Sequence, residues 1–112
     1  MAVTIKPLIA PKQAEITAVV QYTAPASVKT IIDKMTATNT TGAAAAITVY
    51  LVTAAGSAGT TNTIIAAQSV AAGTCYTCPE IVGHVLNQGD SIATLAGTVS
   101  SITIRASGRE VS

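Results

Sequence analysis

Residues 43–70, AAAAITVYLVTAAGSAGTTNTIIAAQSV, decide the fold class of this chain. Residues 47–52 are its densest run of strand-favouring side chains. A loop of small and uncharged residues follows at 54–62, and a second apolar run begins at Thr63. Two such runs around a small-residue loop predict a β-hairpin. The four alanines at 43–46 favour a helix by propensity, but a helix there would be too short to be stable.

The remaining sequence continues this pattern of short strands and turns. We expect further strands at residues 15–22, 28–38, 90–96 and 99–106, a weaker one at 75–82, and a polar tail at 107–112. Pro79 weakens the strand at 75–82. Neither face of residues 28–38 is cleanly polar, which indicates either a β-bulge or an environment that is buried on both sides. About seven or eight short strands without a convincing helix predict an all-β, antiparallel β-sandwich, either jelly-roll-like or immunoglobulin-like.

The chain of 112 residues is long enough for one domain. We expect residues 1–13 to form an extended N-terminal arm and residues 14–112 a single β-sandwich domain. Pro7 and Pro11 exclude a helix interior and favour extended backbone in the arm. The arm is either a terminus that frays or forms an edge strand, or a segment that becomes ordered against a partner. It has no apolar core of a signal peptide or membrane anchor.

The composition limits both the core and the partners. Hydrophobic residues make up 49% and charged residues 10%, yet the chain has no Phe, no Trp and only three Tyr. Ala, Val, Ile and Thr must therefore fill the core, and we expect stability to depend on partners or self-association. A net charge of +1 with scattered basic residues argues against nucleic acid as a partner. The apolar runs are too short to span a membrane as a helix, so we expect no membrane partner either.

The chemically reactive residues favour structural roles. Cys75 and Cys78 form a CxxC pattern, but a structural zinc site needs four ligands and His84 is the only histidine. A redox pair would lie at a helix N-terminus, so we interpret the cysteines as small structural residues and His84 as a loop residue. The carboxylates are spread too evenly to single out an acid–base pair. Gly56 and Gly59 lack the following Lys-Ser/Thr of a phosphate-binding loop. We therefore expect no enzyme, no catalytic residue, no metal and no cofactor.

The order of these segments resembles a small β-sandwich module of phage virions. The resemblance runs roughly over residues 13–105 and rests on YTAPASVKTII, an Asn-Thr-Thr-Gly turn, AITVYLV, a small-residue loop, TIIAAQSVAAG and GDSIATLAGTVSSITI. These motifs are patterns of small and β-branched residues. The length and the proline-containing arm look most similar to capsid decoration proteins, also called cement or staple proteins, of short-tailed, epsilon-fifteen-like phages.

The resemblance implies a non-enzymatic virion structural protein with a jelly-roll-like fold. Such a protein binds the outer capsid surface, bridges major capsid subunits as a homodimer, and is assembled in the host cytoplasm. Tail components share the pattern, so the alternative is a tail or tail-fibre binding module. We select the arm and the small-residue loop as capsid contacts. The selected residues are Val3, Ile5, Lys6, Pro7, Leu8, Ile9, Pro11, Gly56, Ser57 and Gly59.

Overall fold

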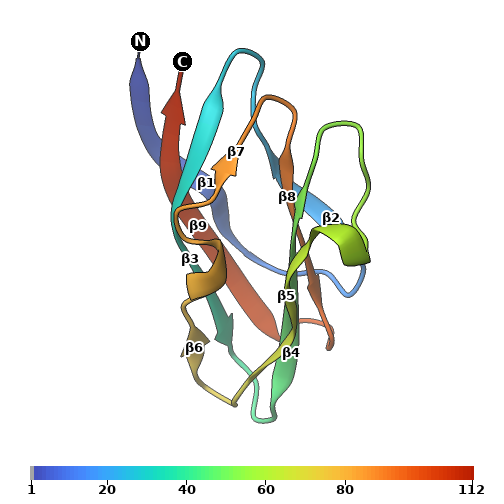
Figure 1. Ribbon diagram of the computed structural model, residues 1–112. Helices are drawn as coiled ribbons and strands as arrows, with labels where there is room; N and C mark the ends of the chain where they lie inside the picture. Colours follow the sequence, from blue (N-terminus) through green and yellow to red (C-terminus); the bar gives the residue numbers. More distant parts are fainter. Residues whose placement is uncertain (1) are drawn as a thin grey trace.

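The computed structural model describes residues 2–112, which form two antiparallel sheets packed face to face (Figure 1). One sheet has the order β1-β9-β3-β6, with β7 also paired to β3, and the other has the order β2-β8-β4-β5. The strands are β1 (Val3–Gln13), β2 (Val19–Thr23), β3 (Lys29–Asn39), β4 (Ala45–Val52), β5 (Thr63–Val70), β6 (Cys75–Tyr76), β7 (Val85–Leu86), β8 (Ser91–Ala96) and β9 (Ile102–Val111). Two 3₁₀ turns complete the chain, η1 (Thr60–Asn62) and η2 (Pro79–Ile81). Within residues 2–112, no helix is long and apolar enough to cross a membrane.

The strands pair in the nested order of a jelly roll. β4 and β5 form the central hairpin, and β3 pairs with β6 and β7 around it. β2 then pairs with β8, and β1 pairs with β9. If β6 and β7 are taken as two parts of one interrupted strand, four nested antiparallel pairs fold over into two layers. The prediction of an antiparallel, jelly-roll-like sandwich is therefore confirmed, and the strand order is not immunoglobulin-like.

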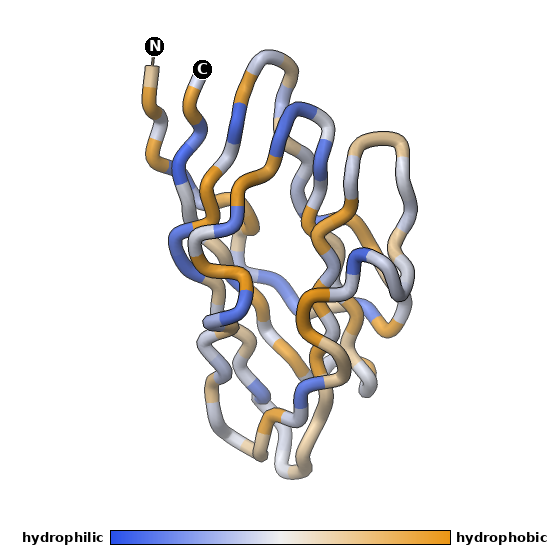
Figure 2. Tube along the Cα trace, in the orientation of Figure 1, coloured by the Kyte–Doolittle hydropathy of each residue, from blue (hydrophilic) through white to orange (hydrophobic). Residues whose placement is uncertain are grey.

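The hairpin predicted from residues 43–70 is present as β4 and β5. Ala45 and Ala46 belong to β4, so strand pairing on both sides overrides the helix propensity of the alanines. Ile47 and Val49 are fully buried between the sheets. In Figure 2, apolar residues follow the strands through the middle of the molecule.

The bulge expected in residues 28–38 lies at Asp33 in β3. The pairing of β3 with β9 shifts between Ile32 and Lys34. Thr30 and Ile32 are buried before the shift, and Met35 is buried after it, so the inward-facing positions change from even to odd numbers. This change explains why neither face of the segment reads as cleanly polar.

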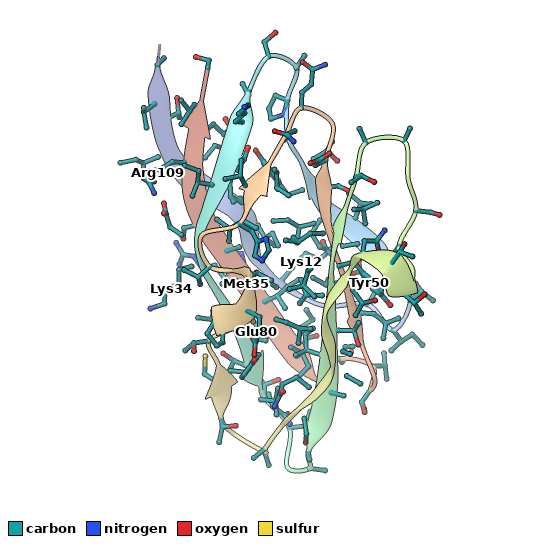
Figure 3. All side chains as sticks on the ribbon, in the orientation of Figure 1. Lys12, Lys34, Met35, Tyr50, Glu80 and Arg109 are labelled. Carbon is teal, nitrogen blue, oxygen red and sulfur yellow. The ribbon has the colours of Figure 1, made fainter. Side chains whose placement is uncertain are left out.

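Aliphatic and small side chains fill the core, as the composition predicts. Side chains from both sheets meet in the space between them, with Met35 among them (Figure 3). The largest fully buried apolar side chains are Ile9, Ile32, Met35, Ile47, Val49, Ile81, Leu86, Ile92, Ile102 and Ile104. Tyr22 and Tyr76 pack against this core from its margin.

Residues 3–13 form strand β1 at the edge of the first sheet, which is the edge-strand alternative for the expected N-terminal arm. Two sequence-based boundaries need correction. The tail expected at 107–112 is strand up to Val111, because β9 pairs there with both β1 and β3. β2 begins at Val19, later than the expected residue 15.

The expected strand at 75–82 contains only Cys75–Tyr76. Cys78 has a left-handed backbone with φ of 48°, and Pro79 then opens η2. The proline lacks the N–H that a continued strand pairing would use.

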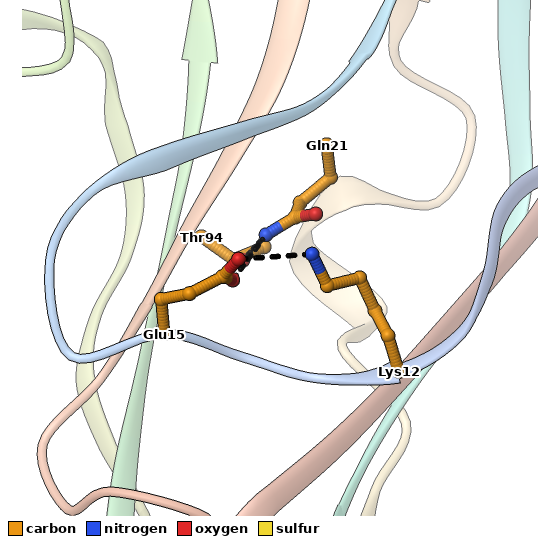
Figure 4. Close-up of polar contacts among 4 residues, drawn as sticks. All are labelled: Lys12, Glu15, Gln21 and Thr94. Atoms are coloured by element: carbon orange, nitrogen blue, oxygen red, sulfur yellow. Dashed lines mark hydrogen bonds and ion pairs between the residues drawn. The ribbon is translucent and has the colours of Figure 1, made fainter.

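Two polar clusters tie connections to the sheets. Near the β1–β2 connection, Glu15 accepts hydrogen bonds from Lys12 Nζ at 3.0 Å and Gln21 Nε2 at 2.9 Å, and Gln21 also donates to Thr94 Oγ1 at 3.1 Å (Figure 4). The bonds from Lys12 and Gln21 lower the pKa of Glu15.

The second cluster surrounds Asn39, which is fully buried at the end of β3. Its Nδ2 donates to Ala43 O at 2.7 Å and to Val70 O at 2.9 Å. Its Oδ1 accepts from the backbone N–H and the hydroxyl of Thr41, at 2.9 and 2.7 Å. Asn39 therefore clamps the turn before β4 to the end of β5.

Candidate functional site

The exposed N-terminal candidates lie on the outer part of strand β1. Ile5 is 80% exposed and Val3 is 55% exposed, which is unusual for aliphatic side chains on a strand. Pro7 and Pro11 are exposed further along the same strand. The structure thus places four of the selected residues where a partner could reach them.

Leu8 and Ile9 are a correction to the selected set. They are 6% and 2% exposed and belong to the core, because β1 turns their side chains toward the second sheet. Their side chains are not available to a partner. The alternation of the strand is disturbed here, with register shifts after Pro7 and after Ile9, which is why both neighbouring residues are buried.

Lys6 belongs to a polar cluster between the sheets. Its Nζ lies 3.6 Å from Glu110 Oε2, and the same carboxylate accepts a hydrogen bond of 2.6 Å from the Tyr22 hydroxyl. The Tyr22 hydroxyl also lies 2.7 Å from Thr30 Oγ1. Burial and the neighbouring Glu110 raise the pKa of Tyr22 to about 12. The cluster fastens β2 of one sheet to β1, β3 and β9 of the other.

The second predicted region is the loop between β4 and β5. Gly56 and Ser57 are exposed, and Gly59 is half-buried. Asn62 holds the loop together, since its Oδ1 accepts from Gly59 N at 2.9 Å and its Nδ2 donates to Ser57 O at 2.9 Å. The loop presents backbone and small side chains, with no charged group between residues 54 and 62.

The jelly-roll order brings both regions to the same end of the sandwich. We call it the terminal end, and it comprises the first residues of β1, the last of β9, and the loops at 24–28, 53–62 and 87–90. Figure 1 shows both chain ends and these three loops on one side of the molecule. The β1 segment and the 53–62 loop belong to different sheets, so they lie at this end without being neighbours.

Asp90 joins two of these loops, a role that the sequence did not reveal. Its carboxylate accepts hydrogen bonds from Ala54 N at 2.9 Å and Asn87 N at 3.0 Å. Gly89 has φ of +84°, and a Cβ there would approach the Ala54 Cβ to 2.9 Å. The sequence indicates a turn at Gly89-Asp90, but it carries no signal for the partner loop 36 residues away.

An open recess of about 540 Å³ also lies at the terminal end. It is lined by Ser27, Val28, Lys29, Asn87, Gln88, Val111 and Ser112. Lys29 is the one charged residue in this lining.

The chemically reactive residues lie apart from this end. Cys75 is exposed and Cys78 is buried, and both are free thiols. Burial raises the pKa of the Cys78 thiol to about 12. His84 lies exposed on the surface, in the loop before β7. Within residues 2–112, no three His, Cys, Asp or Glu side chains come together as a metal site.

The remaining carboxylates make separate structural contacts. Asp33, the bulge residue of β3, accepts two hydrogen bonds from Arg109, Nε to Oδ2 at 3.0 Å and Nη2 to Oδ1 at 2.9 Å. Glu80 accepts a hydrogen bond from the Tyr76 hydroxyl. Each of these carboxylates therefore has its own hydrogen-bond donor and a structural role.

Comparisons with known proteins add one structural similarity. No family model matches the chain, and no curated protein matches its sequence. Among solved structures, the chain is similar to one in a structure of infectious bursal disease virus, Gx strain, with 15% identity and a TM-score of 0.43. The match covers 97% of this chain and 30% of the viral chain. The jelly-roll assignment rests on the strand order described above.

Proposed function

We propose that this protein is a non-enzymatic virion structural protein that binds the outer surface of a phage capsid and bridges major capsid subunits. The observation that carries the proposal is the terminal end of the jelly roll. Exposed aliphatic residues of β1, an uncharged small-residue loop and an open recess are gathered there on a rigid sandwich. This surface suits contact with another protein better than chemistry on a small molecule.

The sequence resemblance to decoration proteins supports the same function. In this role each copy needs only modest affinity, because a homodimer that touches two capsid subunits binds the second at a high effective concentration. A two-fold dimer also matches the local two-fold positions of a shell, since its interface is self-complementary. The bridge would stabilise the shell against the pressure of the packaged DNA.

The loop between β4 and β5 offers a test that leaves the fold intact. Gly59 has extended backbone with φ of −172°, and no atom lies within 4 Å of a Cβ added there. Gly59→Trp should therefore fold normally and block capsid contact by its bulk. Gly42→Trp is the matched control, because Gly42 is equally open but lies in the turn before β4, at the other end of the sandwich.

The measurement is co-sedimentation of the purified protein with undecorated phage capsids. We expect Gly42→Trp to bind like the wild type and Gly59→Trp to lose most of its occupancy. Equal occupancy of the two variants would remove the loop from the contact. If wild-type protein does not bind capsids and is found in virions only at the tail, the capsid function is wrong and the tail module replaces it.

The structure also changes how β1 should be tested. Deleting residues 2–11 would remove Leu8 and Ile9 from the core and uncover one side of β9. Loss of binding by that deletion could then reflect unfolding. Single substitutions at exposed positions of β1 avoid this ambiguity.

A further inference from the structure

The first residues of β1 form an unpaired sheet edge whose hydrogen-bonding groups can be assigned. Ala2 and Ser112 exchange two backbone hydrogen bonds, Ala2 N to Ser112 O at 3.3 Å and Ser112 N to Ala2 O at 2.9 Å. The pairing of β1 with β9 then continues without a shift from Val3 to Pro7. Hydrogen-bonded pairs alternate along an antiparallel ladder. The backbone groups of Thr4 and Lys6 therefore point to β9, and those of Val3, Ile5 and Pro7 point to the free edge.

The side chains along this edge are exposed from Ala2 to Ile5. Val3 and Ile5 are 55% and 80% exposed. Lys6 is on the opposite face, where it meets Glu110. The free edge thus combines open N–H and C=O groups with uncovered β-branched side chains, the combination that recruits another strand.

The other sheet edges are irregular, which sets this one apart. β2 has a register shift between Val20 and Tyr22, and β5 contains Ala67 with φ of +45°. β6 and β7 are two residues each. Bulges and short strands are the usual protection of a sheet edge, and residues 2–6 of β1 have neither.

We propose that this edge pairs with the same edge of a second copy, antiparallel, about a two-fold axis at Thr4. In this register Val3 of one copy and Ile5 of the other form a hydrogen-bonded pair, and the symmetry generates a second pair. The free-edge N–H and C=O groups of Val3 and Ile5 are then all hydrogen-bonded. Pro7 has no N–H to offer to the free edge and is followed by a register shift, so it ends the ladder.

The side chains agree with a second copy as the partner. Val3 meets Ile5 of the other copy across the new pair, and Thr4 faces Thr4, both favourable cross-strand pairs. Lys6 faces Ala2, so no like charges oppose each other. A two-fold dimer of this kind presents two copies of the loop between β4 and β5. The pairing deepens the proposed function and its biological role rests on that function, but the pairing itself is a property of the isolated protein.

The first test removes only the free-edge donor. Ile5→Pro deletes the N–H of residue 5, which does not bond to β9, so the variant should keep the monomer fold. Ile5→Val is the matched control, because Val is similar in size and polarity and keeps the N–H. In sedimentation equilibrium over a concentration series, we expect the wild type and Ile5→Val to dimerise, and Ile5→Pro to raise the dimer Kd about tenfold or more. Thermal unfolding of the dilute protein checks that the three proteins fold alike.

The second test reports the register. In the antiparallel pair proposed, the two Thr4 Cα atoms lie about 4.5 Å apart, which a disulfide can bridge. Thr4→Cys, in a Cys75→Ser background that removes the exposed native thiol, should form a covalent dimer under mild oxidation. Ala2→Cys in the same background should not, because Ala2 lies opposite Lys6.

Three results would overturn the pairing. These are a wild type that is monomeric at every concentration, an Ile5→Pro variant that dimerises like Ile5→Val, and cross-linking of Ala2→Cys as fast as Thr4→Cys. The two proposals fail separately. A monomer that still binds capsids overturns the pairing alone, and a dimer that does not bind capsids overturns the capsid function alone.

Discussion

Replacing Asn39 by Ala should be among the most destabilising single substitutions in this protein. The side chain is fully buried and makes four hydrogen bonds, to Ala43 O, Val70 O and both donors of Thr41. The bond to Val70 O is buried, so losing it leaves an unsatisfied carbonyl at a cost of about 1–3 kcal/mol. The other three are partly accessible to water and contribute about 0.5–1.5 kcal/mol each. These figures sum to about 2.5–7.5 kcal/mol, and we expect about 3–5 kcal/mol because bonds that share one side chain are not additive.

The assay is urea unfolding followed by circular dichroism. A loss of about 3–5 kcal/mol is a large part of the about 5–15 kcal/mol expected for a whole domain. It should lower the Tm by about 12–20 °C. Asn62→Ala is the matched control, since Asn62 makes two similar bonds inside a surface loop, and its loss should cost about 1–3 kcal/mol, less than Asn39→Ala. If the free energy of unfolding of Asn39→Ala is within about 1 kcal/mol of the wild-type value, the stabilising role of the Asn39 hydrogen bonds is refuted.

Three further predictions concern other parts of the molecule. Tyr22→Phe should cost about 1–2 kcal/mol at neutral pH through its lost hydrogen bonds. Because the folded protein raises the pKa of Tyr22 to about 12, above its unfolded value of about 10, the folded state binds this proton more tightly. The wild type should then lose stability from about pH 10 to about pH 12. Unfolding curves across this range should show that the difference in the free energy of unfolding between the wild type and Tyr22→Phe becomes smaller. A difference that stays constant would contradict the hydrogen bonds proposed for the Tyr22 hydroxyl. Iodoacetamide should modify only Cys75 in the folded protein and both thiols after unfolding, as read by mass spectrometry, because Cys78 is buried and its pKa is raised to about 12. Gly108→Ala should cost about 1–3 kcal/mol, since the added Cβ would lie 2.2 Å from Ile31 O, while Gly42→Ala has open space and should change the stability little; equal effects in thermal unfolding would argue against this close approach.

Local features of the fold were predictable from the sequence. The hairpin of β4 and β5 follows from two apolar runs around a small-residue loop, and the bulge at Asp33 follows from the mixed faces of its strand. Both depend on neighbours in sequence. The choice between jelly-roll and immunoglobulin-like order depends on which distant strands pair, and period-two alternation contains no information about that.

The features that the sequence missed are contacts between distant segments. Asn39 looks like an ordinary turn residue, but its amide reaches Val70, 31 residues away. The end of β9 looks like a polar tail because Arg109 faces outward to Asp33, while Gly108 packs against Ile31 from β3. The candidate loop was found from its composition, whereas Leu8 and Ile9 were wrongly included because their burial depends on a strand pairing formed with the other end of the chain.

The position of β9 has a consequence for how the protein is made. β9 is the last strand in chain order, yet it lies between β1 and β3 in the middle of its sheet. During synthesis, β1 and β3 leave the ribosome well before the strand that joins them. Their apolar side chains and unpaired edges stay exposed until β9 is synthesised. This order predicts slow folding and a period in which the nascent chain can aggregate. A nascent chain stalled before residue 102 should therefore depend on chaperones, and release of the ten residues of β9 should complete the sheet in one cooperative step.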